Sequence, residues 1–240
     1  MKALVLFILL GACLTVTAQQ NEGESLFNGK DLSGWMVQCQ PQDSGKTFWT
    51  VDEGTILCNS IGKKEHHHVW LVSEQVFTDF ELNLKFQAYP DSPGNSGLDF
   101  RCRYDSLTEG GWMDGPQVDI NPSGMFWRTG LIYDETTGVR RWIHPSLPDW
   151  NMPEEYKPEK YLFKYAKDGD GWNDLTLICK GMHIRTFVNG IVCTDWDATG
   201  TLDDAVHQKR RVGQSGHIAL QLHNGDELRI RFKDIWIKKL

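Results

Sequence analysis

The sequence predicts an all-β protein, a sandwich or jelly roll in one domain, on three observations. Apolar and polar residues alternate with a period of two in one segment after another, as in strands that bury one face. Gly, Asn and Asp residues that favour turns separate these segments at short intervals. Helical periodicity is scarce, and about 220 residues follow a leader-like N-terminus, a length at which sandwiches commonly form one unit. We therefore expect a single domain over residues 22–240.

The alternating segments are each expected to form a strand or a hairpin. In chain order they are residues 48–59, 80–89, 95–105, 117–121, 174–190, 216–225 and 227–239. Hairpin turns are expected at Lys180-Gly181, Asn189-Gly190 and Asn224-Gly225, because Asn and Gly accept the positive φ that such turns require. Each strand is expected to bury one face and leave the other polar, as in an antiparallel sandwich.

The first 18 residues match a secretory signal peptide. Lys2 gives the positive start, residues 3–10 the apolar run, and Val16-Thr17-Ala18 a cleavage site of small residues. No stretch approaches about 20 apolar residues, so no transmembrane segment is expected. Residues 10–13 also resemble a bacterial lipoprotein box that ends at Cys13. We expect export to the periplasm or the medium, as a soluble protein or lipid-anchored through Cys13.

Charge and cysteine content exclude other classes. The net charge of −7 argues against a nucleic-acid surface, which needs clustered Lys and Arg. Five cysteines follow the signal, an odd number at wide spacings with no CxxC pair, so neither a zinc ribbon nor a dense disulfide framework is expected. Cys102, Cys179 and Cys193 occupy apolar positions and are expected as buried thiols, with one disulfide left open.

Residues 95–105, NSGLDFRCRYD, place an acid and two arginines on one face of the expected strand. Leu98, Phe100 and Cys102 alternate there with Asp99, Arg101 and Arg103. Other alternating segments leave Lys85, Gln117, Asp119, Gln221 and His223 on their polar faces. The guanidinium of Arg and the amide of Gln donate hydrogen bonds in a fixed geometry, and carboxylates accept them. These groups suit a ligand rich in hydroxyl groups. We therefore expect a carbohydrate-binding groove on this face, with plain solvent-exposed surface as the alternative. Trp112, in a Gly-rich loop, is expected to stack on a sugar ring or to cap the core.

Eight fragments of the chain, in order, resemble one known family. They are LFNGKDLSGW, FWTVDEGTILC, DFELNLKF, NSGLDFR, GPQVDI, TGLIYDE, GWNDLTLICKGMHIRTFVNG and GHIALQLHNGDELRIRFKDIWIKKL. They run from Leu26 to Leu240, and the series resembles the 3-keto-disaccharide hydrolases. The resemblance implies a concanavalin A-like jelly roll of two antiparallel sheets, one of them concave. It also implies a small carbohydrate substrate, a 3-keto-glycoside whose C3 hydroxyl a partner sugar 3-dehydrogenase has oxidised.

The resemblance also implies a groove lined by the residues after NSG, by GPQVDI and by LQLH, the face that the alternation selects. Many family members have Glu and then Gln where this chain has Gln117 and then Asp119. A ketone at C3 acidifies the C2 proton, so a base can form an enolate that expels the aglycone and gives net hydrolysis after water adds. We expect Asp119 as the base, Arg101 and Arg103 as enolate clamps, and His223 as the acid or second base. The expected substrate-binding residues are Lys85, Asn95, Asp99, Trp112, Gln117 and Gln221.

Two other functions compete with this hypothesis. A conventional glycosidase needs two carboxylates around the glycosidic bond, and Asp99 and Asp119 are the available pair. Arg101 and Arg103 are expected to lower the pKa of both carboxyls, which would remove the proton donor of that mechanism. A non-catalytic carbohydrate-binding module is the second alternative, because jelly rolls also host lectins.

The run KKEHHHVW raises the question of a divalent metal. Adjacent histidines of a strand point to opposite faces, so at most His66 and His68 could share an ion. Such an ion could polarise the 3-keto oxygen. Exposed loop histidines are the alternative, and no other cofactor is expected.

Overall fold

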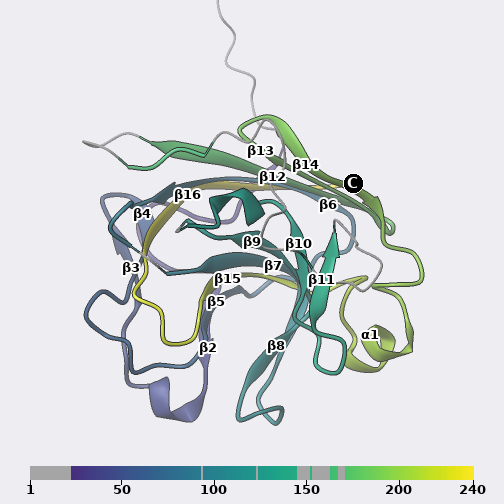
Figure 1. Cartoon of the computed structure of the whole chain (residues 1–240), viewed down its shortest axis with the longest axis horizontal. Coiled ribbons are helices and arrows are strands. Elements are labelled where there is room, and N and C mark those ends of the chain that lie inside the picture. Colours follow the sequence, from purple (N-terminus) through teal and green to yellow (C-terminus); the bar gives the residue numbers. More distant parts are fainter. Residues whose placement is uncertain (1–22, 93, 123, 145–151, 153–162, 167–170) are drawn as a thin grey trace, which may run out of the picture.

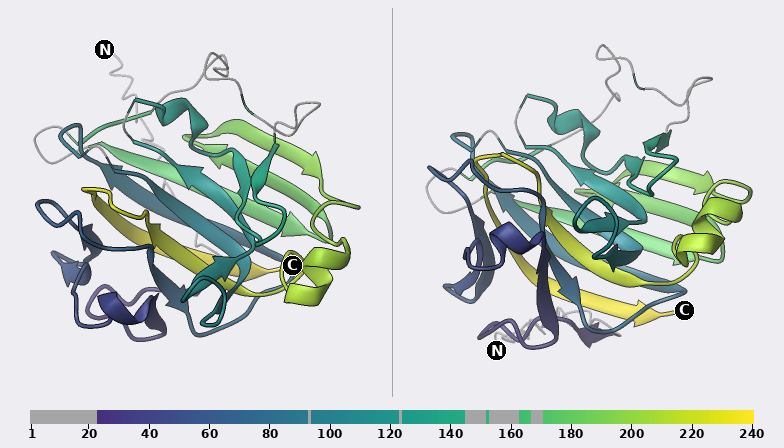
Figure 2. Two further views of the ribbon diagram at one scale, coloured as in Figure 1. Left: turned by 60° about the horizontal axis from the view of Figure 1, so that its bottom comes forward. Right: turned by 90° about the horizontal axis from the view of Figure 1, so that it is seen from below.

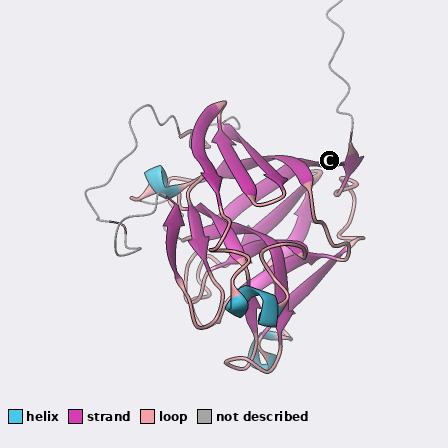
Figure 3. Ribbon diagram, turned by 90° about the vertical axis from the view of Figure 1, so that its right-hand side faces the viewer, coloured by secondary structure: helices cyan, strands magenta, loops and turns pink. Residues whose placement is uncertain are grey.

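The computed structural model describes residues 23–240 apart from residues 93, 123, 145–151, 153–162 and 167–170. Two antiparallel sheets of eight strands each pack face to face (Figure 1). Helix is confined to short segments, as Figure 3 shows by colour. The all-β jelly-roll prediction is confirmed. The predicted signal peptide and the alternative anchor Cys13 lie outside the described residues.

The first sheet, sheet A, contains strands from both halves of the chain. Its order is β14 (Ile191–Asp197), β13 (His183–Val188), β12 (Trp172–Lys180), β6 (Phe80–Ala88), β16 (Arg229–Lys239), β4 (Thr55–Asn59) and β3 (Trp49–Asp52), with β1 (Glu24–Ser25) paired to β16. Consecutive strands joined by tight turns lie side by side, whereas β6 and β16 meet from distant parts of the sequence.

The second sheet, sheet B, lies below sheet A in Figure 1. Its order is β11 (Arg141–His144), β10 (Ile132–Asp134), β9 (Pro116–Ile120), β7 (Ser96–Asp105), β15 (His217–Leu222), β5 (Val69–Ser73) and β2 (Trp35–Cys39), with β8 (Trp112–Asp114) paired to β7. The helical segments are α1 (Ala205–Arg210) and the single turns Pro41–Asp43 and Phe126–Arg128. No helix of the described residues is long and apolar enough to cross a membrane.

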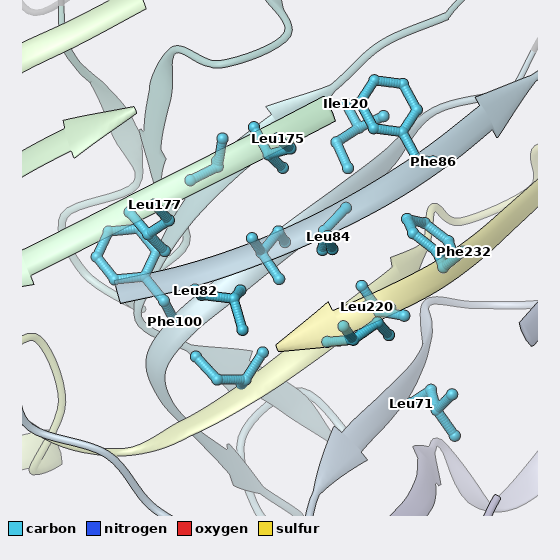
Figure 4. Packing of buried hydrophobic residues seen from close by; sticks show 14 of the residues in the cluster. Leu71, Leu82, Leu84, Phe86, Phe100, Ile120, Leu175, Leu177, Leu220 and Phe232 are labelled. Atoms are coloured by element: carbon cyan, nitrogen blue, oxygen red, sulfur yellow. The ribbon is translucent and has the colours of Figure 1, made fainter. Parts of the chain in front are cut away.

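The inner faces of the two sheets form the core. Leu82, Leu84 and Phe86 of β6 point into it, as their alternation predicts, and are almost completely buried. Figure 4 shows them in one core with Phe100, Ile120 and Leu220 of sheet B. Burial of each such side chain contributes about 1.5–3 kcal/mol. The period of two therefore fixes which face of each strand is left for the solvent or a ligand.

The alternation in β7 is interrupted by a bulge at Arg101. Ile218 of β15 pairs with Phe100 and His217 pairs with Cys102, so Arg101 is an extra residue, with φ of 48°. Phe100 points into the core, but Cys102 packs on the outer face of sheet B with Trp70 and other residues. The prediction that Leu98, Phe100 and Cys102 share one face is therefore wrong at Cys102.

Two of the three predicted hairpin turns are confirmed. Asn189 and Gly190, with φ of 51° and 78°, join β13 to β14, and Gly181, with φ of 56°, begins the turn from β12 to β13. Asn224-Gly225 does not close a hairpin, because β15 and β16 lie in different sheets. The five cysteines of the described part of the chain are free thiols, with Cys102 and Cys179 buried and Cys193 half-buried.

Candidate functional site

A hollow of about 310 Å³ opens on the outer face of sheet B. Strands β9, β10 and β11 and the loops before β5, after β10 and after β15 contribute to it. Its lining residues are His68, Asn95, Trp112, Gln117, Asp119, Asn121, Arg128, Tyr133, Glu135, Arg140, Trp142 and His223. These residues combine carboxylates, cations, amides and aromatic rings, a set that can bind hydroxyl groups and transfer protons.

The strand register places the central residues of this hollow. Gln117 lies opposite Asp99 of β7 on one side and opposite Tyr133 of β10 on the other. Asp119 lies opposite Gly97. A Cβ atom at Gly97 would come within 2.2 Å of Cδ of Gln117, so the glycine leaves the space in which the Gln117 amide lies across the strand. The outward-facing positions of β9 are thus filled by Gln117 and Asp119, as predicted.

Asp119 is held in place at the bottom of the hollow. Its side chain is almost inaccessible, since the residue is only 4% exposed. The amide Nδ2 of Asn95 donates a hydrogen bond of 3.1 Å to Oδ1, and Oδ2 has no partner among the described residues. Burial raises the pKa of Asp119 to about 6, although Asn95 and the charges of Arg128 and His223 favour the ionised form. An oriented carboxylate with one free oxygen can act as a general base near neutral pH.

Glu135 is a second carboxyl group of the hollow that sequence reasoning missed. It directly follows β10, and its backbone N–H donates to the carbonyl of Gly115 at 2.9 Å. Burial raises the pKa of Glu135 to about 7, while Arg140 and His223 lower it. Glu135 ends the fragment TGLIYDE, which supports the family resemblance. Its strand of three residues has too little alternation to show which side chains face outward.

His223 and His68 lie beside each other at the wall of the hollow. Their rings make an edge contact with centroids 4.7 Å apart, and His68 also stacks on Trp70 at 5.3 Å. Nδ1 of His223 lies 3.5 Å from a carboxylate oxygen of Asp226, and this interaction raises the pKa of His223. Burial and nearby positive charges lower the pKa of His68 to about 3, so His68 is neutral near pH 7, whereas the pKa of His223 is shifted in the opposite direction.

Two arginines near the carboxyl groups were also missed. The guanidinium of Arg128 lies 5.1 Å from the ring of Trp127 and 5.3 Å from that of Trp142. Arg140 lies 3.7 Å over the ring of Trp112 and forms an ion pair of 3.1 Å with Glu109. The predicted residue Trp112 does line the hollow, but Arg140 covers one face of its ring. Arg128 ends the single helical turn after β9 and Arg140 lies in the loop after β10, two short segments in which no periodicity marks a side chain.

The structure does not place Arg101 or Arg103 in the hollow. Arg101 is 1% exposed, and its guanidinium donates to the carbonyls of Thr78, Gly181 and Gly213 and to the carboxylate of Asp79. The bulge turns it away from the outer face, so the expected clamp role is not supported by its position. Arg103 lies near the opposite end of β7, where Nε donates to the carbonyl of Arg211 at 2.8 Å.

Three further residues that were predicted to bind substrate do not line the hollow. Lys85 is on β6 of sheet A and pairs with Asp174 there, so its expected place in the groove is wrong. Asp99 and Gln221 do lie in sheet B but are fully buried beneath the hollow. Asp99 accepts a 3.3 Å hydrogen bond from Gln117 and reaches the site only through it. Asn95, Gln117 and His223 line the hollow as predicted.

The expected effect of the arginines on carboxyl pKa values is also wrong. Burial, with repulsion from Glu135, raises the pKa of Asp99 well above its usual range, and burial likewise raises that of Asp119. Arg101 and Arg103 point elsewhere, so they do not hold these carboxyls ionised. The conventional glycosidase is therefore not disfavoured on this ground.

The pair of His66 and His68 is not arranged for a shared metal ion. His66 is buried against Phe48, and its two ring nitrogens lie 2.7 Å and 3.0 Å from the carbonyl oxygens of His67 and Asp226. His68 instead faces the hollow. Within the described residues, no group of three or more His, Cys, Asp or Glu side chains could hold a metal ion.

A jelly-roll sandwich with such a hollow suits a carbohydrate ligand, and the family of the chain supports a carbohydrate-active protein. The sequence matches the 3-keto-alpha-glucoside-1,2-lyase-like domain over residues 22–238, and the chain belongs to this family. No curated protein matches it. A provisionally assigned glycosyl hydrolase from Parabacteroides distasonis ATCC 8503 is 18% identical, with a TM-score of 0.53 over 90% of this chain and 92% of that one.

Two more solved structures share the fold. A second provisionally assigned glycosyl hydrolase from the same organism is 19% identical, with a TM-score of 0.53 over 92% of this chain and all (100%) of the other. A Bacillus subtilis protein of unknown function with a galectin-like fold is 12% identical, with a TM-score of 0.50 over 87% of this chain and 90% of that chain. These similarities show the fold.

Proposed function

We propose that this protein cleaves 3-keto-glycosides by removing the C2 proton and eliminating the aglycone, with net hydrolysis as the outcome. The observation that carries the proposal is Asp119, a buried carboxyl with a pKa of about 6, oriented by Asn95 and with one oxygen free of partners among the described residues. Membership of the 3-keto-alpha-glucoside-1,2-lyase-like family supports the choice of substrate.

The proposed steps assign one role to each charged group. Asp119 takes the C2 proton, and the electron pair of that bond forms an enolate whose oxygen faces the positive charge of Arg128. The enolate then forms a C1–C2 double bond as the C1–oxygen bond breaks, and His223 protonates the leaving oxygen. Water adds to C1 of the unsaturated ketone, Glu135 accepts the proton of the water, and Asp119 returns its proton to C2. Glu135 then gives its proton to solvent and His223 takes one from solvent, so every group returns to its starting state. Arg128 takes the role first expected of Arg101 and Arg103.

The proposal extends to the setting of the reaction. A 3-keto-glycoside has to be supplied by a sugar 3-dehydrogenase, so we propose functional coupling to such an enzyme. The leader-like N-terminus supports export, in which case keto-sugar cleavage takes place in the periplasm or the medium. The exported protein is either soluble or anchored to a membrane by a lipid on Cys13.

The Asp119→Asn variant tests the proposal. With a 3-keto-glucoside that carries a chromogenic aglycone, we expect kcat to fall by about 10²- to 10⁴-fold, because the amide cannot accept the proton, while substrate binding is retained. Asp174→Asn is the matched control, since it makes the same change on sheet A, far from the hollow.

Three outcomes would overturn the proposal. Full activity of the Asp119 variant would exclude the carboxylate as the base. Equal release from the ordinary glucoside would show a conventional glycosidase. Sugar binding without release from either glucoside would indicate a carbohydrate-binding module.

A further inference from the structure

A second and larger hollow, of about 890 Å³, lies on the same outer face of sheet B. Strands β2 and β5, the β7–β8 hairpin and α1 surround it, toward the end of β7 remote from Asn95 and Asp119. Figure 2 (right) looks onto this face and shows α1 in yellow-green at its edge. Trp70, Trp112 and Tyr104 pack together on the outer face, and Trp112 lines the first hollow while Tyr104 lines the second. The two hollows are therefore separate.

Positive charge predominates in this second hollow, whose lining has four cationic side chains and only two carboxylates, Asp105 and Asp114. Lys209 and Arg211 line it, and their side chains have no ion pair within the described part of the protein. Arg103 uses only Nε, which donates to the carbonyl of Arg211, so its two terminal nitrogens face no partner among residues that the structure describes. Arg210 is different, since it pairs with Asp114 at 2.7 Å and with Asp105 at 3.6 Å.

Local structure accounts for only part of this charge. Cations are favoured at the end of a helix, which explains Lys209 and Arg210 in the last turn of α1. It does not explain Arg103, which comes from a different strand. Arg211 has φ of 59° at the position where Gly or Asn ordinarily ends a helix. Three cations that form no ion pair among the described residues therefore lie around one hollow, beside Arg210 and its two carboxylates, in a chain whose net charge is −7.

We propose that this cationic hollow binds an acidic glycan, one whose sugar units carry carboxylate or sulfate groups. Arg103, Lys209 and Arg211 would pair with the acidic groups. Gln38 and Ser106 also line the hollow and offer neutral hydrogen-bonding groups for hydroxyls, and the ring of His217 lies beside them. A nucleic acid would need a longer basic stripe than three free cations on an acidic protein. The site would anchor the protein on an acidic glycan independently of the reaction in the first hollow.

The test compares two double variants that remove the same charge. The double variant Lys209→Gln/Arg211→Gln removes two positive charges from the lining of this hollow. The control double variant, Lys63→Gln/Lys64→Gln, removes two positive charges from the lining of a different cavity. Affinity of the full chain is measured for a heparin-derived sulfated oligosaccharide, an oligogalacturonate and a neutral oligosaccharide of equal length. We expect the wild type to bind one of the acidic probes and not the neutral one. We expect the Lys209/Arg211 variant to lose at least tenfold in affinity and the Lys63/Lys64 variant to bind like the wild type.

The two acidic probes distinguish sulfate from carboxylate recognition. Equal losses in both variants would overturn the proposal, because they would show an effect of overall charge. Equal binding of the neutral probe, or tighter binding of single-stranded DNA than of either glycan, would overturn it too. Melting temperature and cleavage of the 3-keto-glucoside are measured alongside. If the Lys209/Arg211 variant keeps the melting temperature and the turnover of the wild type, its loss of glycan binding is independent of folding and of the proposed reaction.

Discussion

At the scale of single residues, burial decides what a charged side chain can do. Arg101 and Arg103 are two positions apart in a strand, where alternation predicts one shared face. The extra residue of the bulge breaks this relation. Arg101 becomes a buried anchor between the β6, β7 and β12 regions, and Arg103 becomes part of the cationic hollow. An arginine is expected to donate hydrogen bonds, but its residue type does not show whether the acceptor is a ligand or a backbone carbonyl of the protein.

Arg101 is predicted to act in stability. Arg101→Gln should lower the free energy of unfolding by about 3 kcal/mol, because it leaves the carbonyls of Thr78, Gly181 and Gly213 and the carboxylate of Asp79 without the charged donor of a buried arginine. Arg103→Gln, the control, should change it by less than about 1 kcal/mol, since Arg103 makes one exposed hydrogen bond. Denaturant unfolding checks both values. A stable Arg101 variant that binds substrate but no longer turns it over would show instead that Arg101 belongs to the catalytic machinery.

The raised pKa of Asp119 predicts a pH dependence of turnover. A base must be deprotonated, so kcat/KM should fall as the pH drops below about 6, the pKa of this carboxyl in the free protein. An ordinary aspartate would keep its activity to about pH 4. The measurement is kcat/KM of the 3-keto-glucoside across the acid range. A rate that stays constant down to about pH 4 would contradict Asp119 as a buried base.

At the scale of elements, α1 shows how a short helix is held. Six residues are too few for a stable isolated helix. The Asp204 carboxylate accepts hydrogen bonds from the backbone N–H groups of Val206 and His207 at the N-terminus. The ring of His207 lies between two carboxylates, 2.8 Å from Asp204 and 3.2 Å from Asp134 of β10. This buried contact fixes α1, and with it Lys209, against sheet B.

His207 is predicted to make stability depend on pH. Burial lowers the pKa of His207, but the hydrogen bonds and charges of Asp134 and Asp204 outweigh it and raise the pKa above the usual value. The stabilisation is therefore complete below the ordinary histidine pKa of about 6.5 and is lost as the pH rises through the raised value. Unfolding of the wild type and of His207→Gln, compared from about pH 5 to pH 9, measures it. The advantage of the wild type should shrink toward high pH.

His183→Gln is the control for this experiment, because His183 is exposed and pairs with an exposed Asp195. It should leave the pH profile of stability unchanged. A wild-type advantage that grows with pH would show that His207 is neutral in the folded protein, contrary to the prediction.

At the scale of the whole molecule, the site depends on sheet order. The strands of sheet B that carry the site range along the chain from β5 to β15. Within the sheet, β7 lies between β9 and β15. Asn95 and Asp119 are 24 residues apart and form a hydrogen bond, and Asn95 also accepts from the backbone N–H of His223. Both hollows open on the outer face of sheet B, so the order of the strands in this one sheet sets the position of both.

Much of the fold could be predicted from local pattern. The alternation in β6 and β12 identified buried faces correctly, because burial of apolar side chains at every second position stabilises a strand against a core. The same pattern predicts Gln117, Asp119 and His223 on the polar face, whereas Asn95 is expected only from the resemblance to the family. Glu135 and Arg128 were missed because they follow short or irregular segments, where side-chain direction has no periodic signal.

The sequence by itself determined the class of fold, the family, and most of the polar face of sheet B. Only the tertiary structure decided that the bulge removes Arg101 from that face, that Lys85 belongs to the other sheet, and that Glu135 and Arg128 complete the hollow. The physical reason is the range of the interactions. Periodicity and turn propensity act between neighbours in the chain, whereas strand order, bulges and the pKa shifts caused by burial arise from contacts between segments that are distant in sequence.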